Sequence, residues 1–266
     1  MLSVQTGRPH PVRADARDEF FLEELRKEFS DECSLLMEGP VSRGWYYPHS
    51  DVNYYVVDPT ATSGLDTSWP SLPSDGRFYY REGKRFQVFR VAESAIEEFL
   101  SVVTSIDDGT KRSRAAIPSE ILAEAARLSD AVLVDPGTSD LEWQTKLTKQ
   151  LSCILSGISE ERGKSAIAET LSFLGSGDEE TAVLTAVEAL ENSIDILFLR
   201  HGQMSPDTKW RYKKIQEIES SLPAMQFATT ASECRRLLAR ADLDVESGGE
   251  WCHQVIDFCQ QILAAR

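Results

Sequence analysis

The chain has no excess of basic residues. Of its 266 residues, 28 are Lys or Arg and 43 are Asp or Glu, which gives a formal net charge of −15 at pH 7. Binding to a nucleic-acid backbone rewards a basic face that neutralises the phosphates. The charge balance therefore argues against a nucleic-acid partner. It suits a site for cationic small molecules, or an ordinary acidic surface.

Long hydrophobic runs are also missing. No apolar run approaches the roughly 20 residues of a membrane span, and residues 1–17 are polar, with Pro9 and Pro11 among them. We therefore expect neither a signal peptide nor a membrane partner. The five cysteines are odd in number and scattered, without a C-x-x-C pair, which indicates reduced thiols and a cytoplasmic location.

Motifs of common hydrolases are absent too. The sequence contains no G-x-S-x-G, P-loop or H-E-x-x-H pattern. His10, His201 and His253 show no metal-ligand spacing. A Cys/His nucleophile pair stays open, because residues that are neighbours only in space cannot be identified from one sequence.

The sequence does contain a glycine turn that leads into a strand with an acidic start. The turn runs from Gly39 to Trp45, and the strand over residues 51–57 begins with Asp51 and continues to Asn53. Residues two apart on a strand point to the same face, where two carboxylates could hold two metal ions about 4 Å apart. Asn53 supplies only a neutral oxygen, so we expect Asp51 to be the metal ligand and magnesium to bind weakly.

A strand over residues 85–91 is the best source of a further acid. Its middle positions offer Gln87 and no Asp or Glu. A working metal site would have to recruit another carboxylate, and Glu38, Asp58 and Glu82 are the candidates nearby. A turn and a strand of this kind also occur in many unrelated folds, so the pattern needs support from elsewhere in the chain.

Two later segments add that support, and together the segments resemble the nucleotidyltransferase superfamily, of the small-molecule kanamycin (aminoglycoside) type, with a degenerate metal-binding motif. Residues 129–137 form an apolar strand followed by Asp-Pro-Gly, which resembles a late segment of that family, an apolar strand followed by Asp-Pro-x-Gly. Residues 186–202 and 206–214 form a helix, a polar turn and a Lys-Trp helix start, which resemble its C-terminal helical domain. The resemblance covers about residues 18–220.

The resemblance implies an α+β (α/β) fold. A nucleotidyltransferase-type mixed sheet with flanking helices would come first, followed by a C-terminal helical bundle. The turn residues Gly39, Ser42 and Arg43 would then bind nucleotide phosphates, although Pro40 stands where the family has serine. Active sites between subunits occur in some relatives, so a homodimer is also a prediction.

The helical part offers further site candidates. By resemblance, Lys209 contributes to phosphate binding, and a glutamate acts as general base, with Glu188 or Glu191 in the matching region. Lys213 shares a helix face with Lys209 at i, i+4. His49 lies beside the expected site and is a candidate ligand residue, with a plain loop role as the alternative. The alternative for the lysines is a solvated basic surface, and for the glutamates helix-surface ion pairs.

The chain divides near residue 110 in this interpretation. Residues 1–17 are a flexible N-terminus, residues 18–110 the nucleotidyltransferase-like domain, and residues 111–266 a mainly helical domain whose strand 132–134 returns to the N-terminal sheet. Residues 59–76 form a surface insertion, and residues 107–115 a linker. Helical periodicity predicts helices over 18–30, 93–103, 118–128, 141–155, 160–174, 179–200, 209–220, 230–241 and 249–265.

Two functional classes follow from these residues. The first is a repurposed or inactive site that binds a nucleotide or small polar ligand in the interdomain cleft, without standard two-metal catalysis. The second is an active, magnesium-dependent nucleotidyltransferase, which moves a nucleoside monophosphate from a nucleoside triphosphate to a hydroxyl of a small molecule such as an amino sugar. Other chemistry in the same pocket, with Asn53, Gln87, Arg43 and His49 orienting a substrate, remains a third alternative.

Overall fold

The computed structural model describes residues 16–45, 50–62, 72, 75–81, 83–106, 117–138, 141–204, 208–221, 227–239 and 248–265. The chain forms two compact units. Unit 1 contains Met1–Val103 and Ala123–Leu147, and unit 2 contains Thr104–Leu122 and Thr148–Arg266.

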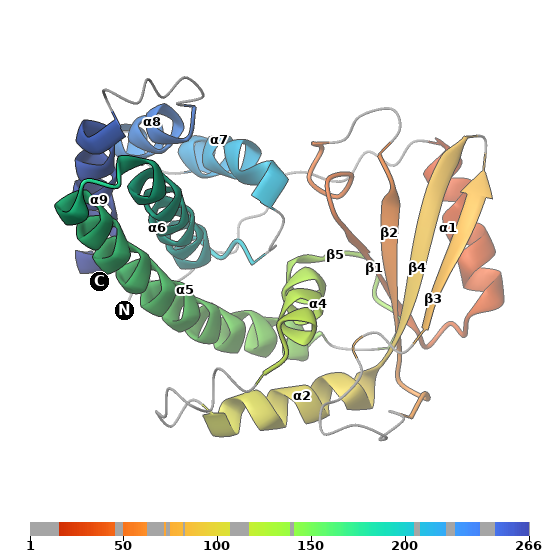
Figure 1. Ribbon diagram of the computed structural model, residues 1–266. Helices are drawn as coiled ribbons and strands as arrows, with labels where there is room; N and C mark the ends of the chain where they lie inside the picture. Colours follow the sequence, from red (N-terminus) through yellow and green to blue (C-terminus); the bar gives the residue numbers. More distant parts are fainter. Residues whose placement is uncertain are drawn as a thin grey trace. The chain divides into compact units, whose positions relative to one another are not determined.

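A five-stranded mixed sheet forms the centre of unit 1 (Figure 1). The strands lie in the order β3-β4-β2-β1-β5. β2 and β4 run parallel, and the other neighbouring strands run antiparallel. This mixed sheet confirms the predicted α+β class. The strand bounds are β1 Ser34–Glu38, β2 Val52–Asp58, β3 Asp75–Arg81, β4 Lys84–Ala92 and β5 Val132–Asp135.

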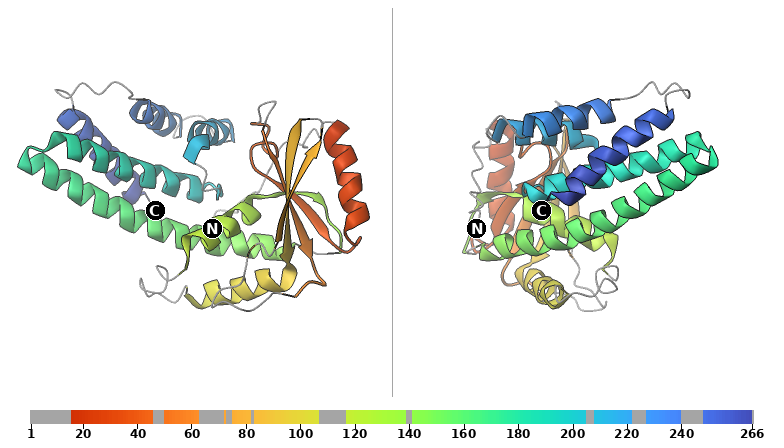
Figure 2. Two further views of the ribbon diagram at one scale, coloured as in Figure 1. Left: turned by 45° about the vertical axis from the view of Figure 1, so that its right-hand side comes forward. Right: turned by 90° about the vertical axis from the view of Figure 1, so that its left-hand side faces the viewer.

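Helix α1, Ala16–Glu28, covers one face of the sheet (Figures 1 and 2). Its Phe21 ring stacks on Phe86 of β4 with the ring centroids 4.2 Å apart, and tilts against Tyr54 of β2 at 5.9 Å. Alternate strand residues point to this side, as the period of two in a β-strand requires. The buried residues of this core are Phe21, Leu22, Leu25, Cys33, Leu35, Met37, Val41, Val52, Tyr54, Val56, Phe86 and Val88.

Helix α4, Ser119–Asp130, meets the opposite face of the sheet. There the hydroxyl of Tyr55 donates to Glu124 Oε2 at 2.9 Å, and the Tyr55 ring stacks on Phe89 at 5.2 Å. Burial, and then the negative charge of Glu124, raise the pKa of Tyr55 well above 10. Tyr55 therefore stays protonated and remains a hydrogen-bond donor. Helix α2, Glu93–Ile106, follows β4 directly and buries Ile96 and Phe99.

The segment Asp135-Pro136-Gly137 lies at the end of the last strand of this sheet. β5 pairs with β1, and Asp135 accepts a hydrogen bond from Arg26 Nε at 2.7 Å. Gly137 has φ +53°, and a Cβ there would lie 2.5 Å from the Cys33 carbonyl oxygen. Any other residue would clash with this backbone, so the glycine is required by close packing.

Unit 2 is helical throughout its described residues. Its core combines residues of α5, α6, α7, α8 and α9, with Trp251 among the largest buried side chains, and α6 packs along α9. Asp178 caps α6 by accepting a hydrogen bond from the Thr181 backbone N–H. The bounds are α5 Glu142–Ser176, α6 Glu179–Arg200, the 3₁₀ helix η1 Thr208–Trp210, α7 Arg211–Ser221, α8 Phe227–Leu238 and α9 Gly248–Ala264.

The prediction of two helices over 141–155 and 160–174 is wrong, because α5 is one helix of 35 residues. The polar stretch around Gly157 suggested a break. A glycine inside a helix costs only about 1 kcal/mol, and buried residues on both sides, Ile154 and Ala166, hold the helix together. The predicted linker 107–115 lies outside the described residues, as does much of the predicted insertion 59–76.

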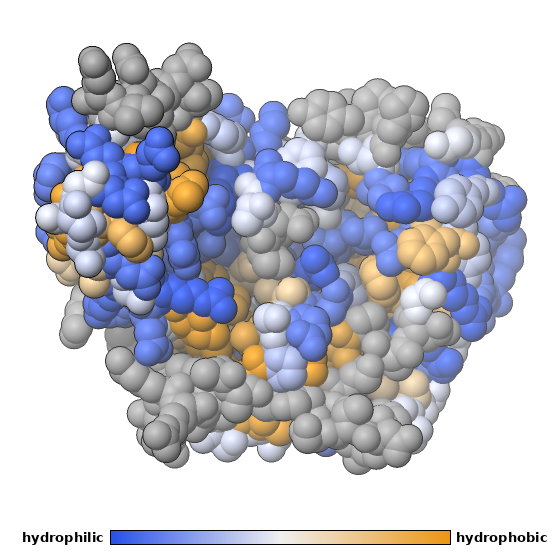
Figure 3. Space-filling view, in the orientation of Figure 1, coloured by the Kyte–Doolittle hydropathy of each residue, from blue (hydrophilic) through white to orange (hydrophobic). Residues whose placement is uncertain are grey.

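The surface mixes polar and apolar side chains. Figure 3 shows hydrophilic side chains around separate hydrophobic patches. Across the helices that the structure describes, none combines the length and the apolar character needed to cross a membrane.

Candidate functional site

Three polar side chains lie in a row across the sheet face opposite α1. Strand register places Glu38 of β1 opposite Asn53 of β2, and Asn53 opposite Gln87 of β4. Residues next to them on the strands belong to the α1 core: Met37, Val52, Tyr54, Phe86 and Val88. Strand alternation therefore points all three to the other face. We call Glu38, Asn53 and Gln87 the polar row.

The two polar atoms of the Asn53 amide differ in their hydrogen bonding within the described residues. Its Nδ2 donates to Glu38 Oε2 at 3.1 Å and lies 3.4 Å from where a Cβ would stand on Gly39. Gly39 has φ +91°, so glycine suits this turn for conformation as well as space. The donor end must face the carboxylate, because an amide oxygen there would be repelled. The other end, Oδ1, is buried, and no hydrogen bond reaches it within the described residues.

Asp51, the predicted metal ligand, is bound by an arginine. Nε of Arg85 donates to Asp51 Oδ1 at 2.8 Å, and Nη2 of the same guanidinium contacts Oδ2. The hydrogen bonds and the charge of Asp51 raise the pKa of Arg85. Both carboxylate oxygens therefore already face a fixed cation in a bidentate pair.

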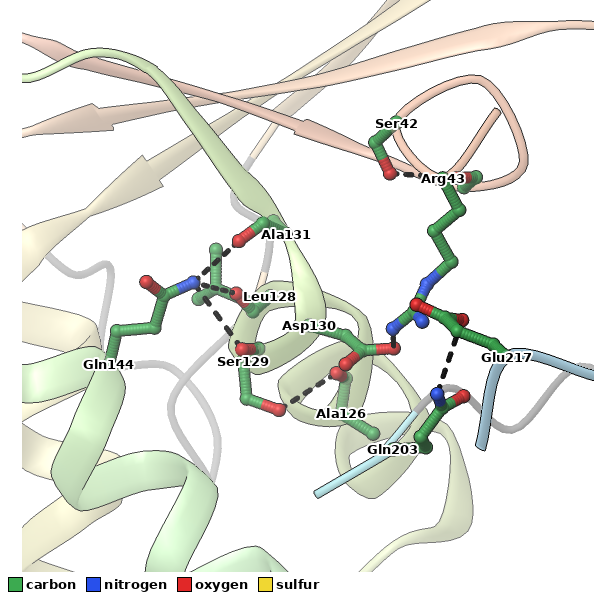
Figure 4. A network of polar contacts seen from close by, with 11 residues as sticks. Ser42, Arg43, Ala126, Leu128, Ser129, Asp130, Ala131, Gln144, Gln203 and Glu217 are labelled. Carbon is green, nitrogen blue, oxygen red and sulfur yellow. Dashed lines mark hydrogen bonds and ion pairs between the residues drawn. The ribbon is translucent and has the colours of Figure 1, made fainter. Parts of the chain in front are cut away.

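The glycine turn is tied to the protein interior. Ser42 Oγ donates to the Gly39 carbonyl at 2.8 Å. The Arg43 guanidinium forms an ion pair with Asp130 at the end of α4 (Figure 4). It also lies 5.1 Å from the Trp45 ring centroid. The Asp130 side chain is only 3% exposed. Ser42 and Arg43 thus stabilise the turn, and their binding of phosphate stays a prediction.

Gln144 of α5 holds the end of α4 where Asp130 lies. Its Nε2 donates to the carbonyls of Leu128, Ser129 and Ala131 at 3.3, 3.3 and 2.7 Å (Figure 4). These carbonyls belong to the last turn of the helix and the residue after it, where no backbone N–H further along the helix is left to bind them. Gln144 therefore fixes the position from which Asp130 reaches Arg43.

The predicted helical site residues belong to unit 2. Glu191 pairs with Nη1 of Arg211 at 2.6 Å, and Arg211 also pairs with Asp195 at 3.1 Å. Arg211 is buried, so Glu191 neutralises an interior cation. Glu188 is exposed, and its backbone carbonyl accepts from Asn192 Nδ2 at 2.8 Å. Neither glutamate belongs to unit 1, which contains Asp51.

The predicted basic cluster is divided between surface and interior. Lys209 lies in η1 and is exposed, with its Nζ 5.8 Å from the Trp210 ring centroid. Lys213, in α7, is exposed as well. Lys214 is buried, with its Nζ 5.3 Å from the Phe198 ring centroid. Lys209 and Lys213 are thus available to solvent. Lys209 lies in the 3₁₀ helix η1 and Lys213 in α7, so the two lysines do not share one continuous α-helix.

The residues around Asp51 do not fit a two-metal magnesium site. Magnesium prefers carboxylate oxygens, but Asp51 is held by Arg85, and Asn53 and Gln87 are neutral amides. In the part of the chain that the structure describes, no group of three or more His, Cys, Asp or Glu side chains could hold a metal ion.

The three candidates for a recruited carboxylate differ in position. Glu38 lies beside Asn53 in the polar row. Asp58 lies at the other end of β2, on the α1 face, where it pairs with Arg90, so its proposed recruitment is wrong. Glu82 lies outside the described residues, and so does the candidate ligand residue His49.

Sequence reasoning missed the partners of the site residues. Arg85 lies in the predicted strand 85–91, and Asp130 in the segment that resembles the family, yet neither had an assigned role. No spacing in the sequence pairs them with their partners, because Asp51 lies 34 residues from Arg85 and Arg43 lies 87 residues from Asp130. The exposed aromatic residues Phe78 and Tyr80 had no predicted role either.

One solved structure similar to this chain is a nucleotidyltransferase-like protein from Exiguobacterium sibiricum 255-15. The two share 13% sequence identity with a TM-score of 0.42, over 93% of this chain and 73% of that chain. No protein-family model and no curated protein matches the chain. A TM-score this low establishes neither a shared activity nor shared site residues.

Proposed function

We propose that unit 1 is a nucleotidyltransferase-type domain with a divergent active site, which binds a nucleotide or small polar ligand without standard two-metal catalysis. The observation that supports this most directly is the bidentate pair between Asp51 and Arg85. A guanidinium provides the positive charge that a metal ion would provide beside this carboxylate. Unlike a metal ion, it cannot bridge to a second oxygen ligand such as a phosphate through coordination bonds.

The energetic argument concerns the transition state of phosphoryl transfer. Its charge is neutralised mainly by metal ions and cations. A loss of roughly 4 kcal/mol of this stabilisation would slow the reaction about a thousandfold. Asn53 and Gln87 add no negative charge to attract a metal, so the polar row is better suited to hydrogen bonding than to metal binding.

Ligand binding needs groups that can still form hydrogen bonds. Within the described residues no donor reaches the buried acceptor Asn53 Oδ1, and a buried acceptor is costly unless a donor arrives. In this proposal the donor comes from the ligand. The residues of unit 1 would orient the ligand through the amides of Asn53 and Gln87.

One observation favours a second candidate function, the active magnesium-dependent nucleotidyltransferase acting on a small-molecule hydroxyl. Glu38 lies opposite Asn53, with its Oε2 3.1 Å from the amide nitrogen. It would hold magnesium together with Asp51 if Arg85 released that carboxylate. Glu38 is thus the carboxylate on which this alternative depends.

Calorimetric titration of the purified chain with ATP, GTP, CTP and UTP, each with and without magnesium, tests the proposal. We expect at least one nucleotide to bind with an affinity that magnesium changes less than threefold. Binding that appears only with magnesium would favour the active transferase. No binding by any of the four would overturn the nucleotide part of the proposal.

The Arg85→Gln variant sharpens this test. Removing the guanidinium frees Asp51, so magnesium should affect nucleotide binding or thermal stability more in this variant than in the wild-type chain. Arg81→Gln is the matched control, because Arg81 also pairs with a carboxylate, Glu24, but on the α1 side of the sheet. An equal response to magnesium in both variants would contradict a role for Arg85 in blocking the metal.

A further inference from the structure

Two aromatic rings lie exposed beside the polar row. Phe78 is 55% exposed and Tyr80 72% exposed, and they are two residues apart on β3, at an edge of the sheet. Tyr79, between them, points to the α1 side, where its ring lies 5.4 Å from Phe21. Single exposed hydrophobic residues are normal. Phe78 and Tyr80 instead expose two neighbouring aromatic rings on one face of an edge strand.

Strand register joins these rings to the candidate site. Phe78 lies opposite Gln87, and Tyr80 lies opposite Arg85. Because adjacent strands are about 4.8 Å apart, Phe78 and Asn53 are separated by two spacings, about 10 Å. A ligand resting on the rings could therefore reach the amides of the polar row.

The amides beside the rings keep unused hydrogen-bonding capacity. Gln87 is half-buried, and no hydrogen bond within the described residues engages its amide. A carboxamide offers a donor and an acceptor side by side. That pair matches an adenine-type edge, on which an amino group lies next to a ring nitrogen.

The charges on this face indicate whether the bound part of the ligand is charged or neutral. Arg85 is committed to Asp51, and its guanidinium carbon lies 5.6 Å from the Phe78 ring centroid. The pair is neutral as a whole, so this surface offers no new attraction to a phosphate. Aromatic faces bind bases by stacking, without any need for charge.

We propose that Phe78 and Tyr80 form a stacking platform for a neutral, adenine-like heteroaromatic ring, and that the Gln87 amide binds the edge of that ring. This inference rests on the proposed function, because that function places the ligand on this face. It adds that the protein recognises the base and not the phosphates.

Titration of the full chain with adenosine, ATP and purine riboside tests the platform. We expect adenosine and ATP to bind within threefold of each other. Purine riboside, which lacks the amino group, should bind about tenfold more weakly, as expected for the loss of base-edge hydrogen bonds. ATP binding at least thirtyfold tighter than adenosine would overturn the proposal, and so would an absence of adenosine binding.

Variants locate the binding surface. Phe78→Ala and Tyr80→Ala should each weaken adenosine binding about tenfold, the usual effect of losing a stacking partner. Tyr212→Ala, which removes an exposed aromatic ring in unit 2, should leave the affinity unchanged. Gln87→Leu should abolish the preference for adenosine over purine riboside. Unchanged adenosine affinity in both aromatic variants would overturn the platform.

Two further readouts separate the possible failures. If nucleotide binding requires magnesium and the two aromatic variants bind adenosine more weakly, the proposed function is overturned and the platform is kept. If binding is independent of magnesium and the aromatic variants bind adenosine as the wild-type chain does, the platform is overturned and the proposed function is kept. Light scattering of the same variants tests a different occupant. If the wild-type chain is a dimer that Phe78→Ala and Tyr80→Ala dissociate, the surface joins two copies of the chain, and the platform is wrong.

Discussion

On the α1 face of the sheet in unit 1, aromatic rings pack against one another, while on the opposite face the same strands carry the polar row. Phe86 and Gln87 are neighbours on β4, yet Phe86 is fully buried under α1, whereas Gln87 is half-buried and no hydrogen bond within the described residues engages its amide. On β4, strand alternation thus places a core residue and a residue with capacity to bind a ligand on opposite faces.

Asp58 and Asn53, which lie on opposite faces of the sheet, differ in their hydrogen bonding. Asp58, on the α1 face, accepts hydrogen bonds from Arg90, from the backbone and hydroxyl of Thr60, and from the Ala61 backbone. Asn53 Oδ1, on the other face, accepts none within the described residues. Satisfied buried groups contribute to stability, and unsatisfied ones indicate a function or a cost.

The largest expected effect follows from truncating a ring on the α1 face. Phe86→Ala should lower the free energy of unfolding by about 3–5 kcal/mol, because it leaves a cavity under Phe21. Phe78→Ala, the same change on the other face, should change it by less than about 0.5 kcal/mol. Urea unfolding of both variants measures the difference. Similar losses in the two variants would contradict the division between the faces.

Breaking the buried ion pair should have a comparable effect. Asp130→Asn leaves the mostly buried Arg43 without its carboxylate, and should cost about 3–5 kcal/mol of unfolding free energy. Asp51→Asn removes the carboxylate of a more exposed Asp-Arg pair, which water and salt screen, so its cost should be several times smaller. Thermal and urea unfolding compare the two variants. A larger loss for Asp51→Asn would show that the turn does not depend on Asp130.

Asp58 makes the stability of the α1 face depend on pH. Burial acts to raise the pKa of Asp58, but hydrogen bonds from Arg90 and Thr60 outweigh it, so the pKa is lowered from 3.8. Such a group stabilises the fold above its unfolded pKa, and this contribution is lost as the pH falls through the folded-state pKa. Asp58→Asn should therefore cost about 1–3 kcal/mol at neutral pH.

The difference in unfolding free energy between the wild-type chain and Asp58→Asn should narrow as the pH falls below 3.8. Unfolding free energies measured from neutral pH to below that value provide the test. A gap that stays constant over this range would mean that the Asp58 carboxylate has the same pKa in the folded and unfolded chains.

The smallest expected effect concerns the polar row. Asn53→Asp places a second carboxylate opposite Glu38, and like charges directly across two strands should destabilise the protein by about 1 kcal/mol. Magnesium should recover this loss, because the variant gains a hard oxygen ligand with negative charge. Thermal unfolding with and without magnesium measures both effects. Asn53→Ala is the control, and magnesium should not stabilise it.

Local patterns predicted much of the fold. The helix over residues 179–200 has the predicted bounds. Its apolar residues recur at helical spacing along this range, and Asp178 caps its first turn. The hairpin of β3 and β4 follows equally from alternating residues around Gly83, which has φ +78°. The continuous helix α5 was missed, since packing on both sides of Gly157 outweighs the local preference for a break.

For the candidate site, the sequence by itself determined which residue types are present: an acid at Asp51, and amides at Asn53 and Gln87 where a metal site needs charge. Only the tertiary structure decided their partners. Arg85 binds Asp51 from 34 residues away along the chain, and Asp130 reaches Arg43 from 87 residues away. The physical reason is that ion pairs and exposure depend on which strands and helices become neighbours, and spacing along one strand does not contain that information.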